Sequence, residues 1–406
     1  MKPEVVTLGL GYIGLPTSAL IAKMQIPVLG VDVQSSIVKT INEGKIHIAE
    51  PDLDEIVNEA VKNGLLAASM SPEEANTYLV VVPTPFNSKH EPDISFVESA
   101  TQSVIPLLKA GDLFIIESTC PVGTTEHIAK IIFQARPELS AKISVAYCPE
   151  RVLPGNVMNE LINNDRVVGG IDENSTREAK KFYERFVKGE IHETNARTAE
   201  MCKLVENSSR DVQIAFANEL SIICDKAKID VWNLISLANK HPRVNILSPG
   251  SGVGGHCIAV DPYFIVANYP MESQIIGKAR EINNYKSFWV SEKIQEARLQ
   301  CEVDNGRKPS VALMGLAFKP DIDDLRESPA KYIVQKVLQD DQDGEFFIVE
   351  PNISDHRVFK LTATRDAIEK ADIICFLVAH NEFKKISINN NKKILDFCGV
   401  RTHETL

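Results

Sequence analysis

A glycine-rich turn near the start of the chain constrains the fold more than any other feature. The segment GLGYIG places Gly9, Gly11 and Gly14 after the apolar run VVTL and before a helical stretch that begins near Pro16. This spacing lets backbone amides approach a pyrophosphate at a helix N-terminus, where the helix dipole favours negative charge. Asp32 follows about twenty residues later, at the end of the next strand-like run, and can accept hydrogen bonds from a ribose. The pattern predicts a dinucleotide-binding βαβ unit.

The residue at the end of that second strand also indicates which dinucleotide binds. The Asp32 carboxylate would repel the 2′-phosphate of NADP, and its neighbours Val33 and Gln34 supply no arginine to receive one. NAD is therefore the expected cofactor, and Tyr12 and Ile13 in the same turn are expected to contact it. A tight turn without a ligand and an FAD site remain as alternatives.

The rest of the chain alternates between strand-like and helical segments. Up to about residue 190, strands are expected in VVTL, PVLGVDV, YLVVVPTP, DLFIIEST and ISVAYCPE, with helices between them. Long helical periodicity follows, and strand signals return in PSVALMGLAF, EFFIVEP, ADIICFLVAH and KILDFCG. The expected fold class is α/β, with two Rossmann-like, doubly wound parallel-sheet domains joined by a helical connector. The expected boundaries are 1–197, 198–305 and 306–406.

Composition narrows the classes of partner. The net charge of −11 gives no overall attraction to nucleic acid or to an anionic membrane. No apolar run reaches the roughly 18 residues of a membrane helix, and the N-terminus has no export-signal pattern. The eight cysteines form no C-x-x-C pair, so no metal site is expected. A cytoplasmic protein that binds neither nucleic acid nor membrane is the expectation.

One cysteine stands in a setting unlike the others. In SPGSGVGGHCIAVDP, Cys257 follows a glycine-dense loop and precedes a helical stretch. Glycines permit close approach of a substrate, and a helix N-terminus with nearby lysines would favour a nucleophilic thiolate. A buried structural cysteine explains the position equally well. The G-x-x-x-x-G-K-[ST] phosphate loop is absent, so the glycines do not indicate a nucleoside triphosphatase.

Two further groups of polar residues are candidates for a site. Lys203, Asn207 and Asp211 recur every fourth residue and form a polar stripe on the connector helix. A solvated helix face is the alternative explanation for this stripe. The segment GLAFKPDIDDLRES follows a strand and supplies Lys319 and Arg326, which either bind a diphosphate or are ordinary loop residues.

Several segments, in order along the whole chain, resemble the UDP-glucose/GDP-mannose dehydrogenase family. The resemblance rests on GLGYIGLP, IHIAEPDL, VPTPF, ESTCPVG, YCPERVLPG, NDRVVGG, RTAEMCKL, HPRVNI, GVGGHCIAVDP and GLAFKPDIDDLRESPA. It implies an NAD-binding first domain, a middle region for dimerisation and the catalytic cysteine, and a UDP-sugar-binding last domain. It also implies a role in surface polysaccharide synthesis. A homodimer is expected for a separate reason, because the apolar positions of FANELSIICDKAKIDVWNLI in the connector give more hydrophobic surface than one protomer can cover.

The resemblance assigns a role to individual residues. Those implied to bind NAD are Gly9, Gly11, Gly14, Asp32, Thr84, Thr119 and Arg326. The implied catalytic group is Glu150, Lys203, Asn207, Cys257 and Asp261. Substrate contacts are implied for Arg151, Lys203, Asn207, His241, Arg243, Gly254 and Lys319, with His241 and Arg243 acting across a dimer interface.

The implied reaction is the four-electron oxidation of the C6 alcohol of a UDP-sugar with two NAD molecules. Cys257 would trap the aldehyde as a thiohemiacetal, and a second hydride transfer would give a thioester. Lys203 and Asn207 would stabilise the developing oxyanion. Water oriented by Glu150 or Asp261 would then release the carboxylate, and the sequence leaves the choice between these two carboxylates open.

Departures from the UDP-glucose branch of the family bear on the substrate. Proline and lysine commonly stand there between the cysteine and the aspartate, where this chain has Ala259 and Val260. A second glutamate of that branch is replaced by Pro154. Both changes favour a UDP-N-acetylhexosamine, either the mannosamine or its C2 epimer glucosamine. A two-electron hydroxyacid dehydrogenase and a non-catalytic NAD-binding protein are the competing classes.

Overall fold

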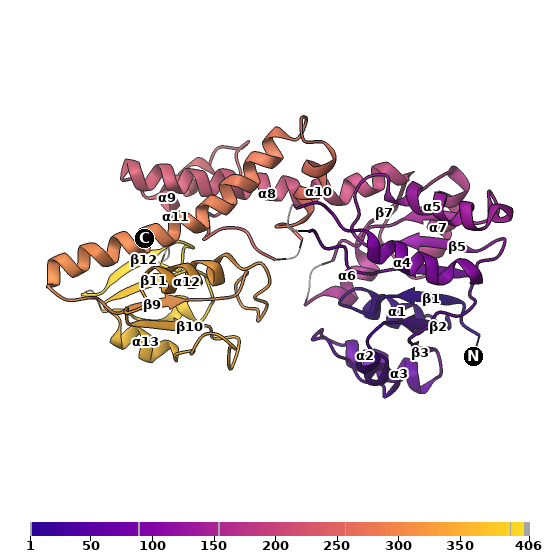
Figure 1. Cartoon of the computed structure of the whole chain (residues 1–406), viewed down its shortest axis with the longest axis horizontal. Helices are drawn as coiled ribbons and strands as arrows, with labels where there is room; N and C mark the ends of the chain where they lie inside the picture. The colour runs from indigo at the N-terminus through magenta and orange to yellow at the C-terminus, as the bar shows by residue number, and fades with distance from the viewer. Residues whose placement is uncertain (1, 88–89, 153–154, 256, 390, 402–406) are drawn as a thin grey trace. The chain divides into compact units, whose positions relative to one another are not determined.

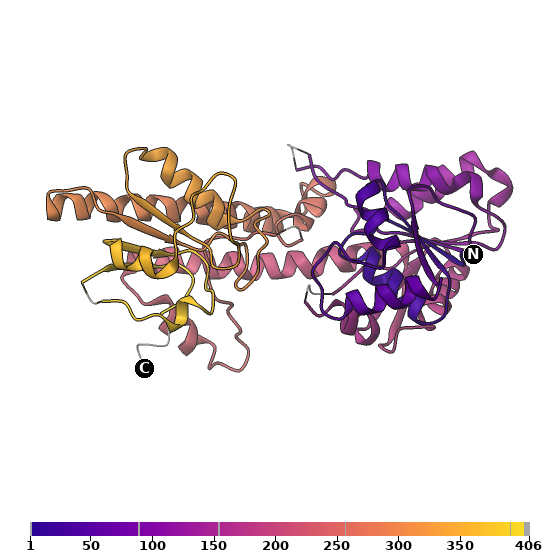
Figure 2. The ribbon, with the colours of Figure 1, turned by 90° about the horizontal axis from the view of Figure 1, so that it is seen from below.

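The computed structural model describes residues 2–87, 90–152, 155–255, 257–389 and 391–401. The chain divides into two compact units, Met1–Glu206 and Asn207–Leu406. Each unit holds one sheet with helices on both faces (Figures 1 and 2). The predicted α/β fold class with two Rossmann-like sheets is confirmed. The three domain boundaries expected from the sequence stay a prediction.

The first unit is built on an eight-stranded sheet in the order β3-β2-β1-β4-β5-β6-β7-β8, counted over the described residues. All neighbouring strands pair in parallel except β6 and β7, which are antiparallel. The strands are β1 (Val5–Leu8), β2 (Val28–Val31), β3 (Leu66–Ser69), β4 (Thr77–Val80), β5 (Leu113–Ile116), β6 (Ser144–Tyr147), β7 (Arg166–Gly170) and β8 (Ile191–Asn195).

Helices cover both faces of this sheet, which explains why its central strands are continuously apolar. Ile115 of β5 packs with the helices on one face, whereas its neighbours Phe114 and Ile116 pack on the other. The helices of this unit are α1 (Gly14–Lys23), α2 (Ser35–Asn42), α3 (Leu53–Lys62), α4 (Ser95–Val104), α5 (Thr124–Ala135), α6 (Val157–Asn163) and α7 (Glu173–Tyr183). Short 3-10 turns follow α4 and α5, at Ile105–Leu107 and Pro137–Leu139.

The second unit consists of long helices followed by a smaller parallel sheet. The order of its strands is β10-β9-β11-β12. Residues of α11 and α12 pack on one face of the sheet, and residues of α13 pack on the other. The elements are α8 (Ala196–Ala227, beginning in the first unit), α9 (Val231–Ala238), α10 (Asp261–Asn268), α11 (Gln274–Asn305), β9 (Val311–Met314), α12 (Pro329–Asp340), β10 (Phe346–Val349), α13 (Thr364–Lys370), β11 (Ile373–Phe376), a 3-10 turn (Phe383–Lys385) and β12 (Lys393–Asp396).

Each strand expected from an apolar run is present, but three strands were not expected. These are β3, β7 and β8, with the sequences LAAS, RVVGG and IHETN. They contain alanine, glycine and polar residues, which are depleted in strands or weak signals for them. β3 and β8 lie at the two edges of the sheet, where one side of a strand needs no partner.

A buried polar network joins α8 to α11 in the second unit. Asp211 of α8 is fully buried, and Arg280 of α11 donates a hydrogen bond from Nη1 to its Oδ1 at 2.7 Å. Asn283 donates to the same oxygen at 2.8 Å and accepts a hydrogen bond from Asn218 at 2.9 Å. Asp211, which belongs to the polar stripe of Lys203 in the sequence, therefore anchors one helix to another and is not solvated.

This network predicts a stability defect. Asp211→Ala would leave the Arg280 guanidinium buried without its counter-ion, and breaking a buried ion pair in this way costs about 3–5 kcal/mol. Urea unfolding should show that loss in the free energy of unfolding. Glu219→Ala, an exposed position on the same helix, serves as the control and should change it by less than about 0.5 kcal/mol. A loss below about 1 kcal/mol for Asp211→Ala would contradict the anchoring role.

Candidate active site

The three glycines of the turn after β1 differ in what a side chain would meet at each position. Gly9 adopts φ +96°, and a Cβ there would collide with the carbonyl oxygen of Val81. A Cβ on Gly14 would collide with the carbonyl oxygen of Gly9, so this glycine lets α1 pack closely on the turn. Gly11 has no atom within 4 Å of the position that a Cβ would take. The open side of Gly11 fits the approach of a pyrophosphate to the backbone.

Asp32 lies directly after β2 and is held beside this turn. Its Oδ2 accepts a hydrogen bond from the Leu10 amide at 3.1 Å, and its Oδ1 accepts one from the Gln34 amide at 2.9 Å. Each carboxylate oxygen has a second lone pair, so a ribose hydroxyl can still donate to it. Tyr12 is exposed and Ile13 half-buried in the same turn. The residues expected to hold NAD therefore fit that cofactor.

Thr84 and Thr119 lie on the loops that follow β4 and β5. Thr84 Oγ1 donates a hydrogen bond to the carbonyl oxygen of Thr119 at 2.6 Å, and Ser118 Oγ donates to the carbonyl oxygen of Val82 at 2.7 Å. The two loops are thus tied together at the edge where the parallel strands end. Ligands of open α/β sheets bind at this edge.

A buried carboxylate that sequence reasoning missed joins α5 to α8. Glu200 accepts hydrogen bonds from the Gly123 amide at 2.6 Å, the Thr125 amide at 2.7 Å and the Thr125 hydroxyl at 2.6 Å. It therefore caps the N-terminus of α5. Glu200 stands three residues before Lys203, so the cap fixes the turn of α8 that carries this lysine against the loop that carries Thr119. The segment RTAEMCKL held this residue, but nothing in it indicated the partner.

Glu50 likewise accepts hydrogen bonds from backbone amides at a helix start, in the segment that follows Glu150. Its carboxylate accepts hydrogen bonds from the Gly155 amide at 2.9 Å and the Val157 amide at 2.7 Å, at the start of α6. Residues 153 and 154 lie between these contacts and Glu150, and Pro154 is outside the described residues. The segment IHIAEPDL thus supplies an anchor for the chain that leaves the predicted catalytic glutamate.

Glu150 and Lys203 are brought together within the first unit. The Lys203 ammonium donates a hydrogen bond to the main-chain carbonyl oxygen of Glu150 at 2.7 Å. The Glu150 side chain is buried, and its Oε1 has no hydrogen-bond partner among the described residues. Burial raises the pKa of this carboxyl, while Lys203 and Arg166 act in the opposite direction. The next residue, Arg151, forms an ion pair with Glu206 at 2.7 Å.

Asn207, Cys257 and Asp261 belong to the second unit. Asn207 Nδ2 donates a hydrogen bond to Asp261 Oδ2 at 2.5 Å. Asp261 is buried and begins α10, and its amide donates to the carbonyl oxygen of Cys257 at 2.8 Å. The Cys257 thiol is half-buried and lies one turn before α10. An amide, a carboxylate and a thiol are thus held close to one helix start.

Packing also explains why glycines stand in the loop before Cys257. A Cβ on Gly254 would collide with the carbonyl oxygen of Glu327, and one on Gly255 would lie 2.8 Å from the Phe318 ring. The Gly255 amide donates to the carbonyl oxygen of Arg326 at 3.2 Å. The loop is therefore packed against the segment GLAFKPDIDDLRES of the same unit, in addition to the substrate approach expected for it.

The remaining predicted residues lie at the surface of the second unit. Lys319, His241 and Arg243 are exposed. Arg326 forms an ion pair with Asp324 at 2.6 Å. The cations Lys319 and Arg243 are thus accessible to an anionic ligand.

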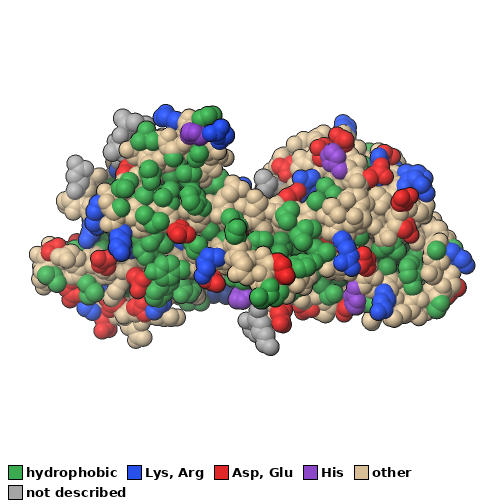
Figure 3. Space-filling view, turned by 90° about the horizontal axis from the view of Figure 1, so that it is seen from above, with side chains coloured by type: hydrophobic (Ala, Val, Ile, Leu, Met, Phe, Trp, Pro, Cys, Tyr) green, Lys and Arg blue, Asp and Glu red, His purple; other side chains and the backbone are tan. Residues whose placement is uncertain are grey.

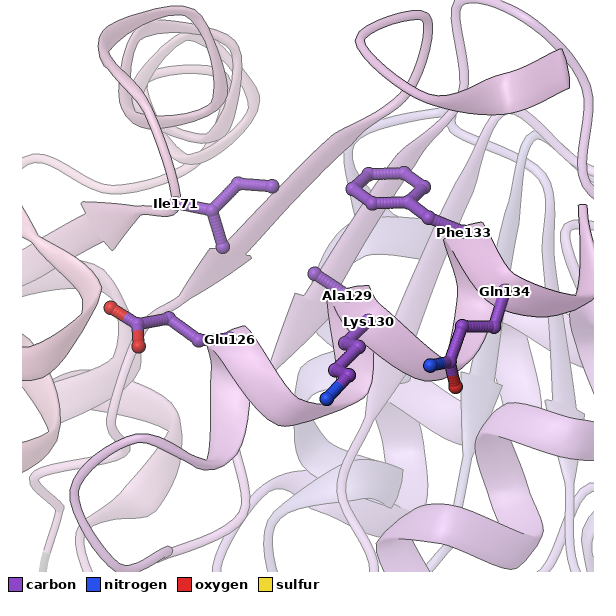
Figure 4. A pocket seen from close by; sticks show the side chains of 6 residues that line it. All are labelled: Glu126, Ala129, Lys130, Phe133, Gln134 and Ile171. Atoms are coloured by element: carbon purple, nitrogen blue, oxygen red, sulfur yellow. The ribbon is translucent and has the colours of Figure 1, made fainter. Parts of the chain in front are cut away.

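The hollow shown in Figure 4 is separate from these residues. It lies beside α5 and is lined by Glu126, Ala129, Lys130, Phe133, Gln134 and Ile171. None of the predicted site residues takes part in it. Among the described helices none is both long and apolar enough to cross a membrane.

The fold and the turn after β1 define a dinucleotide-binding α/β protein with two Rossmann-like sheets. Family models of the UDP-glucose/GDP-mannose dehydrogenase family match the chain throughout. The NAD binding domain matches residues 3–187, the central domain 197–285 and the UDP binding domain 312–402. The chain belongs to this family.

Relatives are similar over almost their whole length. UDP-N-acetyl-D-mannosamine dehydrogenase of Escherichia coli (strain K12) is 51% identical over 413 residues, which cover 97% of this chain and 98% of that protein. NDP-N-acetyl-D-galactosaminuronic acid dehydrogenase of Ralstonia nicotianae is 48% identical, with 97% and 95% covered. The solved structure of UDP-D-ManNAc dehydrogenase from Pyrococcus horikoshii has a TM-score of 0.88 at 36% identity, with 98% and 95% covered.

The geometry of the turn predicts different outcomes at two of its glycines. Gly11→Ala should leave the free energy of unfolding within about 0.5 kcal/mol, because its Cβ meets no atom. The same methyl group should raise the KM for NAD at least about tenfold, since it fills the space where the pyrophosphate approaches. Gly14→Ala should instead lower the free energy of unfolding by about 1–3 kcal/mol. A parental KM for NAD in Gly11→Ala would show that the pyrophosphate binds elsewhere.

Proposed function

We propose that this chain is a UDP-N-acetyl-D-mannosamine 6-dehydrogenase. It oxidises the C6 alcohol of the sugar to a carboxylate with two NAD and yields UDP-N-acetyl-D-mannosaminuronate for surface polysaccharide synthesis. The 51% identity to the Escherichia coli relative over nearly both whole chains carries this proposal. The hydrogen bonds of Lys203 to the Glu150 carbonyl and of Asn207 to Asp261 support it, because they hold four of the residues that the reaction needs.

Residues of this chain form the covalent bond to the C6 carbon and stabilise the oxyanion on it. In the first oxidation the C6 hydroxyl would lose its proton to a base or an ordered water, and NAD, when bound, would supply the hydride acceptor for both oxidations. The Cys257 thiolate adds to the C6 aldehyde, and Lys203 and Asn207 donate hydrogen bonds to the oxyanion that forms. The second hydride leaves the thiohemiacetal carbon, and Cys257 is then held as a thioester.

Hydrolysis of the thioester completes the reaction. A carboxylate, Glu150 or Asp261, accepts a proton from water as the water oxygen attacks the thioester carbonyl, and the Cys257 thiolate leaves. One alcohol, two NAD and one water thus give one carboxylate, two NADH and three protons. Lys203 is a donor in these steps, in keeping with its hydrogen bond to the Glu150 carbonyl.

The configuration of the sugar is the finer part of the proposal. The relative from Ralstonia nicotianae, 48% identical, is named for an N-acetyl-galactosamine derivative. UDP-N-acetylglucosamine remains the C2 epimer to exclude. Ala259 and Val260, both buried in the turn before α10, distinguish this chain from the UDP-glucose branch and favour an N-acetylated sugar.

The test compares UDP-N-acetylmannosamine with the UDP-linked N-acetylglucosamine and N-acetylgalactosamine. With limiting UDP-N-acetylmannosamine, the enzyme should form two NADH per sugar, and kcat/KM should exceed that of the other two sugars at least about tenfold. Cys257→Ala should lose turnover while still binding UDP-sugar and NAD, and Cys257→Ser should stall as a slowly hydrolysed ester. Cys301→Ala, another half-buried cysteine, is the matched control and should keep the parental stoichiometry.

Each part of the proposal has its own contradicting result. A higher kcat/KM with either other sugar would replace the substrate and leave the mechanism in place. One NADH per sugar would indicate a two-electron dehydrogenase. Two NADH per sugar at the parental rate in Cys257→Ala would refute the thioester.

We also infer a homodimer formed by the helical region. Phe216 and Ile223 of α8 and Leu237 of α9 each expose more than half of their surface, at 56%, 54% and 57%. Figure 3 looks onto the face that includes these helices and shows hydrophobic side chains there. Apolar side chains exposed along neighbouring helices mark a surface that a second copy covers in symmetric oligomers.

The homodimer is tested by light scattering at micromolar concentration. The parental chain should have twice the mass of one chain, and Phe216→Glu with Ile223→Glu should shift it toward the monomer by burying two charges in the interface. Val303→Glu, at an exposed position near the end of α11, is the control and should stay dimeric. A parental monomer would exclude the interface and any role of Arg243 in a neighbouring site.

A cytoplasmic location completes the proposal. The cytoplasm is a reducing compartment, in which cysteines stay as thiols. A nucleophilic Cys257 also needs such a compartment to remain reduced. Fractionation of the native host should recover the activity with the cytoplasm, and recovery from the periplasm or medium would contradict this part.

A further inference from the structure

Behind Glu150 lies a cluster of buried charged and polar side chains that the proposed mechanism does not use. Glu117 follows β5, Glu150 follows β6, and Arg166 begins β7. Because β7 runs antiparallel to β6, with Tyr147 opposite Gly169, continuing that register along both chains leads from Arg166 to Glu150. The one antiparallel pair of the described sheet thus brings a cation to the end of β6.

Direct contacts hold the cluster together. Tyr183 of α7 donates a hydrogen bond from its hydroxyl to Glu117 Oε1 at 2.5 Å. The Arg166 guanidinium lies 5.0 Å over the Tyr183 ring, and its Nη1 is 3.9 Å from the Sγ of Cys148, two residues before Glu150. Arg166 Nη2 donates to the carbonyl oxygen of Leu161 at 3.4 Å.

The charges of this cluster are almost completely removed from water. Glu117 is 2% exposed, Arg166 5% and Glu150 8%. Glu117 Oε2 and Glu150 Oε1 both lack a hydrogen-bond partner among the described residues. The negative charge of these two carboxylates is therefore stabilised mainly by the nearby cations. These are the Arg166 guanidinium and the Lys203 ammonium, which donates its hydrogen bond to the main chain of Glu150.

Burial acts on the pKa of every titratable group in this cluster. Burial raises the pKa of the Cys148 thiol to about 11 and raises that of the Tyr183 hydroxyl well above its usual value. Burial likewise raises the pKa of Glu117 and of Glu150, and Arg166 lowers both. For Glu150, Lys203 lowers the pKa most, followed by Arg166 and then by an amide of Arg151, whereas Glu117 raises it.

We propose that Arg166 and Glu117 are positioning residues that set the charge of the predicted catalytic carboxylate. Arg166, together with Lys203, favours the anionic form of Glu150, in which this residue accepts a proton from water. Glu117, held by the Tyr183 hydroxyl, competes with Glu150 for the attraction of Arg166. This proposal rests on the proposed function, with Glu150 rather than Asp261 as the base in hydrolysis. Removing the cation and removing the competing anion must then shift the ionisation of Glu150 in opposite directions.

The experiment is the pH profile of kcat at saturating UDP-N-acetylmannosamine and NAD, because kcat includes hydrolysis of the thioester, whereas kcat/KM reports only the steps up to the first irreversible one. Glu150 acts when deprotonated, so its ionisation gives an acidic limb on which activity rises with pH. Glu117→Gln should move this limb to lower pH, and Arg166→Gln to higher pH, each on the order of one pH unit. Arg166→Lys keeps the charge and should return the limb toward its parental position. A merely structural role would lower the rate without shifts of opposite sign.

Glu117→Gln decides the outcome if Arg166→Gln fails to fold, because the amide keeps the shape of the side chain and still accepts the Tyr183 hydrogen bond. An acidic limb that stays in place in Glu117→Gln, or that moves to higher pH, overturns the proposal. Glu150→Gln is measured beside it. If Glu150→Gln lacks activity while Glu117→Gln keeps the parental limb, only this inference fails. If Glu150→Gln turns over at the parental rate with the parental limb, the proposed role of Glu150 fails, and this inference fails with it.

Discussion

The parallel pairing of β1, β4, β5 and β6 is the constraint on which the first half of the site depends. Val80, Ile116 and Tyr147 are paired in register at the ends of their strands. Parallel strands end at one edge, so the loops after them leave the sheet side by side. The glycine turn, Thr84, Thr119 and Glu150 come to this edge for that reason alone. β7 and β8 run in the opposite direction, and this reversal brings Arg166, at the start of β7, to the same edge.

Carboxylates that accept hydrogen bonds from backbone amides, rather than hydrophobic packing, hold the shape of these loops. The two sheets share one such contact. Asp32 after β2 and Glu350 after β10 each accept a hydrogen bond from the amide of a leucine, at 3.1 and 2.7 Å. In both sheets this leucine follows a glycine with a left-handed backbone conformation. They differ in what remains available to a ligand. Burial alone would raise the pKa of Glu350, but His380 and backbone amides hold it at about 2 and occupy its oxygens. The same position therefore fits a ribose in the first sheet and serves the loop in the second.

The sequence predicts the strands that lie inside a sheet and fails at those whose residues are small or polar. Continuous apolar runs identify β5 and β6, because both faces of these strands are buried. The predicted catalytic residues came from the family resemblance, since spacing alone left Cys257 and the stripe of Lys203 open to structural explanations. Asp211 belongs to that stripe, yet it is buried against Arg280, which stands 69 residues further along the chain. Arg166 lies in the segment NDRVVGG and Glu117 in the segment ESTCPVG, but no local pattern specifies that β7 is antiparallel to β6.

The cost of the buried charges argues that they serve the chemistry. Removing a charged group from water costs several kcal/mol even after the protein relaxes, and packed apolar side chains often replace a buried ion pair without loss of stability. Asp211 and Arg280 at least fix one helix against another through a direct 2.7 Å contact. Glu117 and Glu150 each leave an oxygen without a partner among the described residues, so their burial is not explained by hydrogen bonding. The groups around them come from β5, β6, β7, α7 and α8, and they meet only when the unit is folded. In our proposal the ionisation of Glu150 is a property of the assembled unit, so substitutions that leave Glu150 itself unchanged should alter it.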